Sequence, residues 1–336
     1  MDVAQFDYTL PENLIAQTPL ADRAASRMLV LHRKEGRWED REFRDLPQYL
    51  HAGDWLVLND SKVFPCRLFG APENLSGKVE IFLLRPLSAD ARQWQALVRP
   101  GRKMRVGERI VCEGGLEAEI LSHAEFGERT LQFAPGPDVY EQLEQHGHVP
   151  LPPYIKRLDD PLDRHRYQTV FARERGSVAA PTAGLHFTPG ILGACRVAGA
   201  GIAYVTLHVG LGTFQPLHAA SVEENHLHPE FYAVSNDNAA KIRRAGRAIG
   251  VGTTSVRTME TVARSGNLTG STDLFIYPGF EFRATGGMLT NFHLPRTSLL
   301  MLVCAFAGTE LALTAYRHAV EEQYRFYSYG DCMLIL

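Results

Sequence analysis

The chain has 336 residues, of which 45% are hydrophobic and 22% are charged, and its formal net charge is −3. This composition is ordinary for a globular protein and excludes an intrinsically disordered chain, and the length is sufficient for two domains. The slightly negative charge gives no global electrostatic signal for a nucleic-acid partner.

The N-terminus and the cysteines indicate the compartment. The first seven residues contain neither a basic region nor an apolar run, so we expect no signal peptide. The most apolar stretch, 298–308, is shorter than the roughly 20 residues that cross a bilayer. The five cysteines have no Cys-x-x-Cys spacing, which predicts reduced, mostly buried thiols. We therefore expect a soluble cytoplasmic protein with no membrane partner.

Short strands follow one another between about Trp55 and Phe133. Alternating or wholly apolar patterns occur at 56–58, 78–84, 94–98, 117–121 and 129–133, separated by turn signals such as Pro100-Gly101. Many short strands at regular spacing predict an antiparallel barrel or sandwich. The proline-rich segment 147–154 then interrupts any regular element, and we take it as a domain boundary.

After this boundary, strand patterns alternate with helix patterns. Strands are predicted at 202–207, 248–251 and 274–277. Helices are predicted at 236–249, with Asn236 or Asp237 as its N-cap, and at 298–306 and 310–324. Such alternation predicts an α/β domain.

Basic residues are concentrated locally despite the negative net charge. Between 96 and 109 one acid, Glu108, stands against Arg99, Arg102, Lys103, Arg105 and Arg109. A weaker cluster, diluted by three aspartates, contains Lys156, Arg157, Arg164 and Arg166. Charge alone favours a solvated face for both clusters over contacts with phosphate.

The segment Pro181-Thr182-Ala183-Gly184-Leu185-His186-Phe187 is the first of four polar, glycine-rich loops. Backbone amides around such a glycine can approach a ligand closely, and a histidine can move protons near neutral pH. A buried histidine beside a turn explains the same residues, and for His186 alone we favour that explanation.

Two of the other three loops, at 208 and 251, follow predicted strands, where binding loops of α/β folds lie, and the third is Thr290-Asn291-Phe292-His293-Leu294-Pro295. The loop after residue 251 could open a helix whose free amides suit a carboxylate or phosphate. Four loops of similar chemistry favour a shared polar site. Their candidate residues are His208, Gly210, Thr213, Gly252, Thr253, Thr254, Arg257 and His293.

Several familiar sites are absent or weak. Gly210-Leu211-Gly212 lacks the third glycine of a dinucleotide loop, and no P-loop occurs. His226, His228 and Glu230 could bind zinc or iron from one face of a strand, but Pro229 argues against a regular strand there. We favour a hydrogen-bonding or structural role and expect no metal.

The C-terminal segment 324–331 alternates aromatic and polar residues and ends at Asp331. Aromatic rings beside Arg325 could stack on a base, and packing of the last segment onto the core explains the pattern equally well.

Taken in order, motifs along nearly the whole chain resemble the tRNA ribosyltransferase-isomerases of queuosine biosynthesis. The loops at 181, 208, 252 and 291 and the C-terminal segment are similar to signatures of that family. Further similar motifs are Phe6-Asp7-Tyr8, Leu10-Pro11-Glu12, Leu14-Ile15-Ala16-Gln17, Ser26-Arg27, Leu58-Asn59-Asp60, Pro150-Leu151-Pro152-Pro153-Tyr154-Ile155 and Arg166-Tyr167-Gln168-Thr169-Val170.

The resemblance implies a fold and a reaction. The fold is an α/β catalytic domain, here 1–58 and 150–336, with a smaller antiparallel β-barrel domain inserted at 59–149. The reaction transfers and isomerises the ribosyl moiety of S-adenosylmethionine onto 7-aminomethyl-7-deazaguanine at the tRNA wobble position. Epoxyqueuosine-tRNA, adenine and methionine are the products. We expect S-adenosylmethionine as co-substrate, tRNA as partner and a monomer.

The same chemistry suggests roles for the candidate residues. His186 or His208 is the base that removes a proton beside the sulfonium, and His293 or Asp331 assists the departing adenine. Arg257 or the amides of 252–254 hold the methionyl carboxylate, and Thr182, Gly184, Gly210 and Thr213 complete the co-substrate site. The tRNA backbone would contact Arg99, Arg102, Lys103, Arg105, Lys156 and Arg157.

Four departures from the family pattern stand out, and one of them is Arg296-Thr297-Ser298 in place of the usual Lys-Ser-Thr. Lys62 stands where arginine is usual and loses the bidentate fork. Cys66 replaces a usual alanine, and Pro229 replaces a usual serine, so it cannot donate a side-chain hydrogen bond.

Two other functions are alternatives to this reaction. The chain could be an ordinary S-adenosylmethionine-dependent methyltransferase or a non-catalytic RNA-binding protein.

Overall fold

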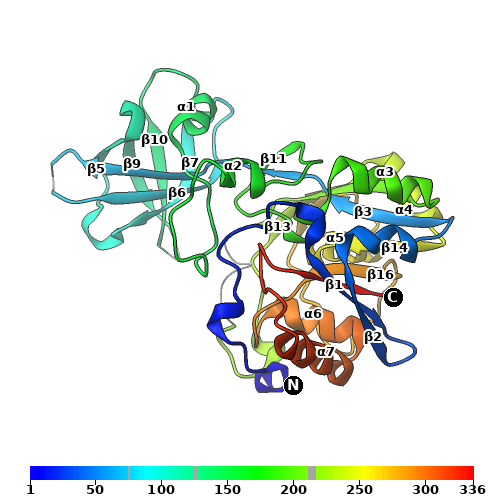
Figure 1. The fold of residues 1–336 in the computed structure, drawn as a ribbon. Coiled ribbons are helices and arrows are strands. Elements are labelled where there is room, and N and C mark those ends of the chain that lie inside the picture. The colour runs from blue at the N-terminus through cyan, green and yellow to red at the C-terminus, as the bar shows by residue number, and fades with distance from the viewer. Residues whose placement is uncertain (75, 125–126, 211–216) are drawn as a thin grey trace.

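The computed structural model describes residues 1–74, 76–124, 127–210 and 217–336. Figure 1 shows a smaller lobe built from strands β5 to β10 and a larger lobe in which helices cover a mixed sheet. The α/β fold with a β-barrel is therefore confirmed.

The smaller lobe is a closed antiparallel barrel in the order β10-β7-β6-β5-β8-β9. Alternate residues of a strand point to opposite sides, so one set, including Trp94, Leu131 and Phe133, fills the interior with no exposed area. The strands are β5 Arg67–Pro72, β6 Val79–Pro86, β7 Gln93–Arg99, β8 Arg109–Cys112, β9 Glu117–His123 and β10 Glu128–Phe133.

The larger lobe contains a nine-stranded sheet in the order β15-β13-β12-β3-β14-β16-β17-β1-β2. Its neighbours β12, β3, β14 and β16 are parallel, so their carboxyl ends meet at one edge. A short parallel pair, β4 Ser61–Val63 and β11 Glu174–Ser177, lies beside it. The strands of the large sheet are β1 Arg27–His32, β2 Arg37–Glu42, β3 Asp54–Asn59, β12 Gly201–Leu207, β13 Glu230–Ala233, β14 Arg247–Val251, β15 Thr269–Thr272, β16 Gly287–Asn291 and β17 Cys332–Ile335.

Helices pack on both faces of this sheet. Val57 of β3 lies in one core cluster with Met259 of α5, and Leu56 lies in another with Leu192 of α3. The longer helices are α1 Val139–His146, α3 Pro189–Val197, α4 Asn236–Arg244, α5 Thr253–Ser265, α6 Ser298–Ala307 and α7 Thr309–Glu321. The shorter ones are α2 Asp163–Arg166, η1 Val3–Phe6, η2 Glu12–Leu14, η3 Arg23–Ala25, η4 Phe43–Tyr49, η5 Gly101–Lys103, η6 Glu113–Gly115, η8 Thr182–His186 and η10 Val222–Glu224.

No single helix in the described ranges is long and apolar enough to cross a membrane. Helices α6 and α7 reach the required length only together, and they are bent by 116° relative to each other. All five cysteines are free and buried, as the sequence predicts.

Most predicted elements are confirmed, and three differ. The predicted helix 236–249 ends at Arg244, because Ala245 has an extended backbone and the chain enters β14 directly. Its N-cap is Ser235, whose side chain accepts a hydrogen bond from the amide of Asn238, and neither Asn236 nor Asp237 caps it. The strand at 56–58, which the spacing pattern grouped with the barrel although the resemblance implies the α/β domain for 1–58, belongs to the large sheet.

The predicted strand 274–277 is wrong. These residues form no strand, although Ile276 is only 1% exposed and lies in the core cluster that contains α6. An apolar run reports burial, and here Ile276 is buried in a core cluster without belonging to a strand.

Candidate active site

The parallel strands bring three of the polar loops to one edge of the sheet. His208 follows β12, Gly252 follows β14, and His293 lies two residues after the end of β16. Because these strands are parallel neighbours together with β3, the residues after them gather at the same edge, where α/β folds bind ligands.

Asn59, at the carboxyl end of β3, forms hydrogen bonds that connect the segments at this edge. Its side-chain amide donates to the carbonyl of Leu207 at 3.0 Å and to Thr254 Oγ1 at 3.2 Å. Its Oδ1 accepts from the amides of Ser61 and Leu207, both at 3.1 Å. One buried side chain thus fixes the ends of two strands and the first turn of α5.

A cavity of about 690 Å³, here named the sheet-edge cavity, opens at this edge. Its volume lies within the ordinary range for small-molecule sites. Its wall contains polar groups from the loops at 182, 252 and 290 and aromatic rings from 154 and 327. The residues on which the argument depends are Thr182, Gly252, Thr253, Thr254, Asn291, His293, Tyr154 and Tyr327.

The first turn of α5 forms one wall of the sheet-edge cavity. Gly252 has φ +86°, a conformation that L side chains rarely adopt, and as the N-cap residue it has no side chain that could cap the helix that follows. Thr253 is 7% exposed, and its hydroxyl has no hydrogen-bond partner among the described residues. Uncapped helix amides beside a buried hydroxyl suit a carboxylate.

His293 also lines the sheet-edge cavity. Its Nε2 is hydrogen-bonded to Thr290 Oγ1 at 2.8 Å, so Nδ1 is the ring nitrogen left for a ligand. Burial lowers the pKa of His293 to about 3, so the ring is neutral at physiological pH. A neutral imidazole can donate to or accept from a base such as adenine.

His186 does not line the sheet-edge cavity. Its Nδ1 is bonded to Ser26 Oγ at 2.8 Å and its Nε2 to Asn291 Oδ1 at 3.1 Å. The side-chain amide of Asn291 in turn donates to the carbonyl of Tyr327 at 2.8 Å. Burial lowers the pKa of His186 to about 4. This histidine therefore holds two cavity residues in place, and both its nitrogens are occupied.

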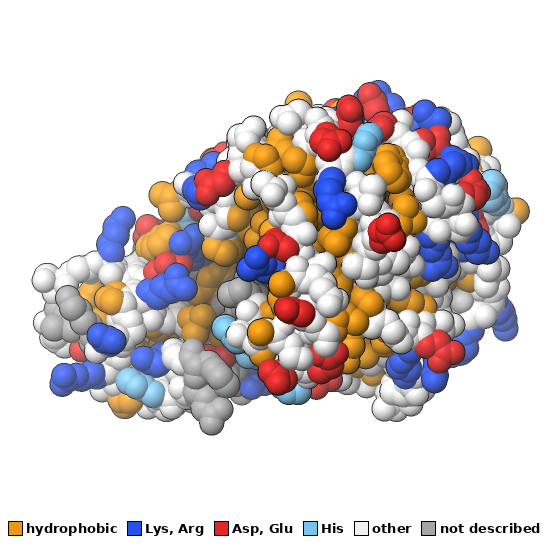
Figure 2. Space-filling model, turned by 90° about the horizontal axis from the view of Figure 1, so that it is seen from below, with side chains coloured by type: hydrophobic (Ala, Val, Ile, Leu, Met, Phe, Trp, Pro, Cys, Tyr) orange, Lys and Arg blue, Asp and Glu red, His pale blue; other side chains and the backbone are white. Residues whose placement is uncertain are grey.

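A second cavity of about 520 Å³, here named the interdomain cavity, lies between the barrel and the larger lobe. Seen from below, hydrophobic side chains line the recess where the two lobes meet (Figure 2). The two cavities share Val209 and Leu299 in their walls, so ligands in them would approach each other there. Other residues of its wall are Arg85, Gln95, Glu128, Tyr140, Arg175, His208, Gly210, Glu230, Phe231 and Arg257.

His208 lies in the wall of the interdomain cavity, directly before the shared Val209. Its ring stacks on Phe231 with a centroid distance of 5.7 Å, and its Nδ1 is buried without a hydrogen-bond partner in the described chain. Burial lowers its pKa, while Glu174 and Asp60 act in the opposite direction. A neutral ring with an unpaired nitrogen can accept a proton.

The guanidinium of Arg257 is already bonded to other groups of the protein. It forms a buried ion pair with Glu230, with each side chain 6% exposed, and donates to the carbonyls of Leu274 and Thr272. The other oxygen of Glu230 accepts from the amide of Gly210 at 2.9 Å. Arg257 therefore reaches the interdomain cavity as half of an ion pair.

Three further candidates lie elsewhere. Gly184 is buried, and a Cβ there would come within 2.8 Å of Phe171 and Thr169, so it serves close packing. Asp331 is 2% exposed and accepts hydrogen bonds from the amides of Arg27 and Arg325, so it lines neither cavity. Thr213 lies outside the described residues.

The predicted tRNA contacts divide into two groups. Arg99, Arg102 and Arg105 are exposed on the barrel and have no acidic partner in the described chain; Lys103 lies among them. Arg99 lies on the same outer face of β7 as Gln95 and Leu97, which line the interdomain cavity. The strip from 99 to 105 therefore begins where the wall of that cavity ends.

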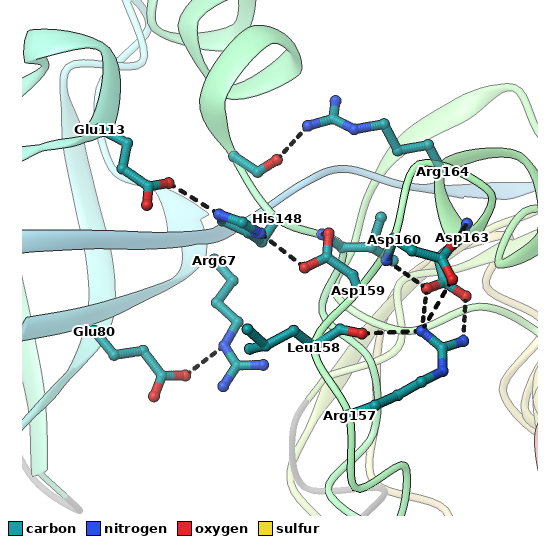
Figure 3. Close-up of polar contacts among 12 residues, drawn as sticks. Arg67, Glu80, Glu113, His148, Arg157, Leu158, Asp159, Asp160, Asp163 and Arg164 are labelled. Atoms are coloured by element: carbon teal, nitrogen blue, oxygen red, sulfur yellow. Dashed lines mark hydrogen bonds and ion pairs between the residues drawn. The ribbon is translucent and has the colours of Figure 1, made fainter. Parts of the chain in front are cut away.

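The second group is paired with acids. Arg157 forms a bidentate ion pair with the fully buried Asp163, at 2.6 and 2.9 Å (Figure 3). Lys156 is exposed and lies 3.1 Å from Glu12. The guanidinium of Arg157 is thus already bound to a protein carboxylate, whereas the exposed ion pair of Lys156 with Glu12 is weak.

The joint between the lobes is polar. His148 lies between Glu113 of the barrel, at 2.9 Å, and Asp159 of the following segment, at 2.7 Å (Figure 3). Arg164 donates to the carbonyls of Glu144 and Gly147 at the end of α1. These contacts set the barrel against the larger lobe and hence the width of the interdomain cavity.

No group of three or more metal-ligating side chains gathers in the described part of the chain. Residues 226–229 have no regular structure, and Glu230 is paired with Arg257. Of the positions that depart from the family pattern, Lys62 lies half-buried in β4, Cys66 is fully buried, and Pro229 is exposed at the wall of the interdomain cavity.

Sequence reasoning assigned no individual role to Asn59, Asn291, Gln95 or Glu128, although Asn59 and Asn291 lie in segments that resemble family motifs. Gln95 and Glu128 look like ordinary polar positions of strands. Only the pairing of strands and lobes shows what these side chains face.

Comparison with known proteins identifies the family. The family model described as "Queuosine biosynthesis protein" matches residues 3–335. The S-adenosylmethionine:tRNA ribosyltransferase-isomerases of Solibacter usitatus and Moorella thermoacetica are 66% and 51% identical, each aligned over 100% of both chains. The crystal structure of the S-adenosylmethionine tRNA ribosyltransferase of Thermotoga maritima is 41% identical, with a TM-score of 0.56, and covers 99% of this chain and 100% of its own.

Proposed function

Because this chain belongs to the S-adenosylmethionine:tRNA ribosyltransferase-isomerase family of queuosine biosynthesis, we propose the complete reaction for it. The enzyme transfers and isomerises the ribosyl moiety of S-adenosylmethionine onto the aminomethyl group of 7-aminomethyl-7-deazaguanine at the tRNA wobble position. Epoxyqueuosine-tRNA, adenine and methionine are its products. The observation that carries this proposal is the pair of cavities that share Val209 and Leu299, one for each substrate.

S-adenosylmethionine binds in the sheet-edge cavity. Its carboxylate lies at the uncapped first turn of α5, beside Thr253 and Thr254, and Thr182 faces the same space. The adenine lies at His293, whose Nδ1 is left for a ring nitrogen of the departing base. Arg257 is the weaker candidate for the carboxylate because Glu230 already neutralises it.

His208 is the base that removes a proton from the carbon beside the sulfonium. The positive sulfur stabilises the carbanion that remains, so a base of moderate strength is sufficient. Support comes from the position of His208 beside the shared Val209 and from its unpaired Nδ1. His186 acts indirectly, because both its nitrogens are bonded to Ser26 and Asn291.

The tRNA partner approaches along the barrel. The exposed Arg99, Arg102 and Arg105, together with Lys103, contact phosphates of the anticodon stem, while the wobble base enters the interdomain cavity. The enzyme acts in the cytoplasm, where tRNA is modified, as a monomer. The proposal includes no metal.

One assay tests the reaction. The enzyme is incubated with S-adenosylmethionine and precursor tRNA, and the products are analysed by mass spectrometry. Free adenine and methionine are expected. S-adenosylhomocysteine would identify a methyltransferase, and tRNA binding without any turnover would identify an RNA-binding protein.

A variant tests the role of His208. With tRNA saturating, His208→Ala should lower the single-turnover rate by about 10²–10⁴, the usual contribution of a positioned base. His226→Ala, which removes an exposed histidine outside both cavities, is the matched control and should keep the normal rate. Near-normal rates in both His208→Ala and His186→Ala would refute a catalytic histidine at either position.

A further inference from the structure

The outer face of the barrel carries a row of polar side chains into the interdomain cavity. Arg85 Nε donates to Gln95 Oε1 at 2.5 Å, and the side-chain amide of Gln95 donates to the carboxylate of Glu128. The three residues come from adjacent strands, β6, β7 and β10, and all line this cavity. The row therefore faces the larger lobe across the cavity.

The two ends of this row have opposite hydrogen-bonding capacity. Arg85 uses Nε within the row, so its terminal nitrogens remain as donors, and it has no ion-pair partner in the described chain. Glu128 accepts from Gln95 and likewise has no cationic partner there, so it keeps free lone pairs as acceptors. A ligand that fits must present an acceptor beside donors.

The surroundings of the row are mostly apolar. Leu84 and Leu97 lie beside it on the outer face of the barrel, and Phe231 and Phe275 lie on the opposite wall. The second carboxylate of the cavity, Glu230, is paired with Arg257, which leaves Glu128 as the carboxylate with spare capacity in the described part of the wall. A flat aromatic ring with polar atoms on one edge fits such a space.

We propose that Glu128, supported by Gln95 and Arg85, recognises the guanine-type edge of the acceptor base. The Glu128 carboxylate accepts from the ring N1–H and the 2-amino group, and the Arg85 guanidinium donates to O6. Enzymes that act on a nucleobase commonly take it out of the stack and recognise this edge by hydrogen bonds. The barrel then supplies base specificity, and the sheet edge supplies the chemistry.

This inference rests on the proposed function, because it assumes that the acceptor is a 7-deazaguanine. It adds which residues distinguish that base from others. Loss of one hydrogen bond to a charged group typically changes discrimination about 10- to 100-fold.

Two RNA substrates test the proposal. One is an anticodon stem-loop with 7-aminomethyl-7-deazaguanine at the wobble position, and the other carries the same base without its 2-amino group. Adenine release with S-adenosylmethionine gives kcat/KM for each. The unaltered enzyme should prefer the first RNA by about 10- to 100-fold, because the second leaves Glu128 without one donor.

Glu128→Gln should lose most of this preference, through slower reaction of the 2-amino substrate. Glu117→Gln is the matched control, since Glu117 is an exposed carboxylate on β9 outside the cavity, and it should keep the full preference. Arg85→Gln should slow both RNAs by a similar factor, because both retain O6. A role of the row in barrel stability alone would leave the preference unchanged.

The outcomes separate this inference from the function on which it rests. Release of no adenine from either RNA by the unaltered enzyme would overturn the proposed function and this inference with it. Adenine release without preference for the 2-amino base, or a preference that survives Glu128→Gln, would overturn the inference alone. If Glu128→Gln does not fold, Arg85→Gln decides, because unequal effects on the two RNAs contradict the assigned edge.

Discussion

The two cavities of this enzyme are built in different ways. The sheet-edge cavity is formed within the larger lobe, by loops that follow parallel strands and by buried side chains such as Asn59 and His186 that fasten those loops. The interdomain cavity has one wall on the barrel and one on the larger lobe, and polar contacts around His148 join the two.

This difference bears on what each cavity can do. A site fastened by strands and buried hydrogen bonds holds reacting groups in fixed positions, as catalysis requires. A site between two lobes can accept a large substrate such as tRNA, because its width depends on the polar contacts between the lobes and not on the pairing of strands in one sheet. Helix α5 connects the two cavities, since its first turn lines one and Arg257 reaches the other.

The largest expected effect tests this connection. Arg257→Met should destabilise the protein by about 3–5 kcal/mol, because it leaves Glu230 buried without its cation. S-adenosylmethionine affinity of the folded protein should change little, since the first turn of α5 is retained. Urea unfolding and calorimetric titration measure the two quantities.

The double variant Arg257→Met with Glu230→Gln is the control. It should recover most of the lost stability, because no unpaired charge remains buried. If the single variant loses its affinity for S-adenosylmethionine as well as its stability, the two cavities are not as separate as their walls suggest.

The next effect concerns the sheet-edge cavity in acid. Burial lowers the pKa of His186 to about 4, below the usual value of about 6.5. As pH falls below about 6.5, the unfolded chain therefore takes up a proton before the folded protein does. The stabilisation is complete above that pH and is lost progressively toward pH 4, by about 3 kcal/mol.

His186→Gln should remove this dependence. Between pH 7 and pH 4.5 the unaltered protein should lose about 2–3 kcal/mol more unfolding free energy than the variant. His226→Gln, which alters an exposed histidine, should follow the unaltered protein. Equal acid sensitivity in His186→Gln and the unaltered protein would show that His186 is not buried in its neutral form.

The smallest expected effect concerns the basic strip from 99 to 105 on the barrel, which lies outside both cavities. Arg102→Glu with Lys103→Glu should weaken tRNA binding about 10-fold and reduce the slope of log affinity against log salt by about 1–2. Filter binding at several salt concentrations measures both. Lys34→Glu with Arg37→Glu, on the β1–β2 hairpin, should leave them unchanged. If the salt slope of the Arg102→Glu, Lys103→Glu variant is unchanged, the tRNA backbone does not contact these two residues.

Local patterns in the sequence predicted much of the fold. The barrel strands, the helices near 298 and 310 and the strand before Gly252 follow from side-chain periodicity, which is a local property. The error at 274–277 has the same origin, since Ile276 is buried in the core without belonging to a strand, and an apolar run does not record what covers it.

The candidate residues divide in the same way. The sequence by itself determined that histidines, hydroxyls and glycines lie in four loops, two of them after predicted strands, because turn chemistry and strand ends are readable over a few residues. It could not decide between His186 and His208, since the difference is that Ser26 and Asn291 occupy one ring while a nitrogen of the other stays unpaired.

Only the tertiary structure decided that four parallel strands bring these loops to one edge, and that Glu128 of the barrel and Glu230 of the larger lobe line one cavity. The pairings of β3 with β12 and β14, for example, join residues more than one hundred positions apart. Their energy comes from packing and hydrogen bonds between distant segments, and no local pattern in the chain records those interactions.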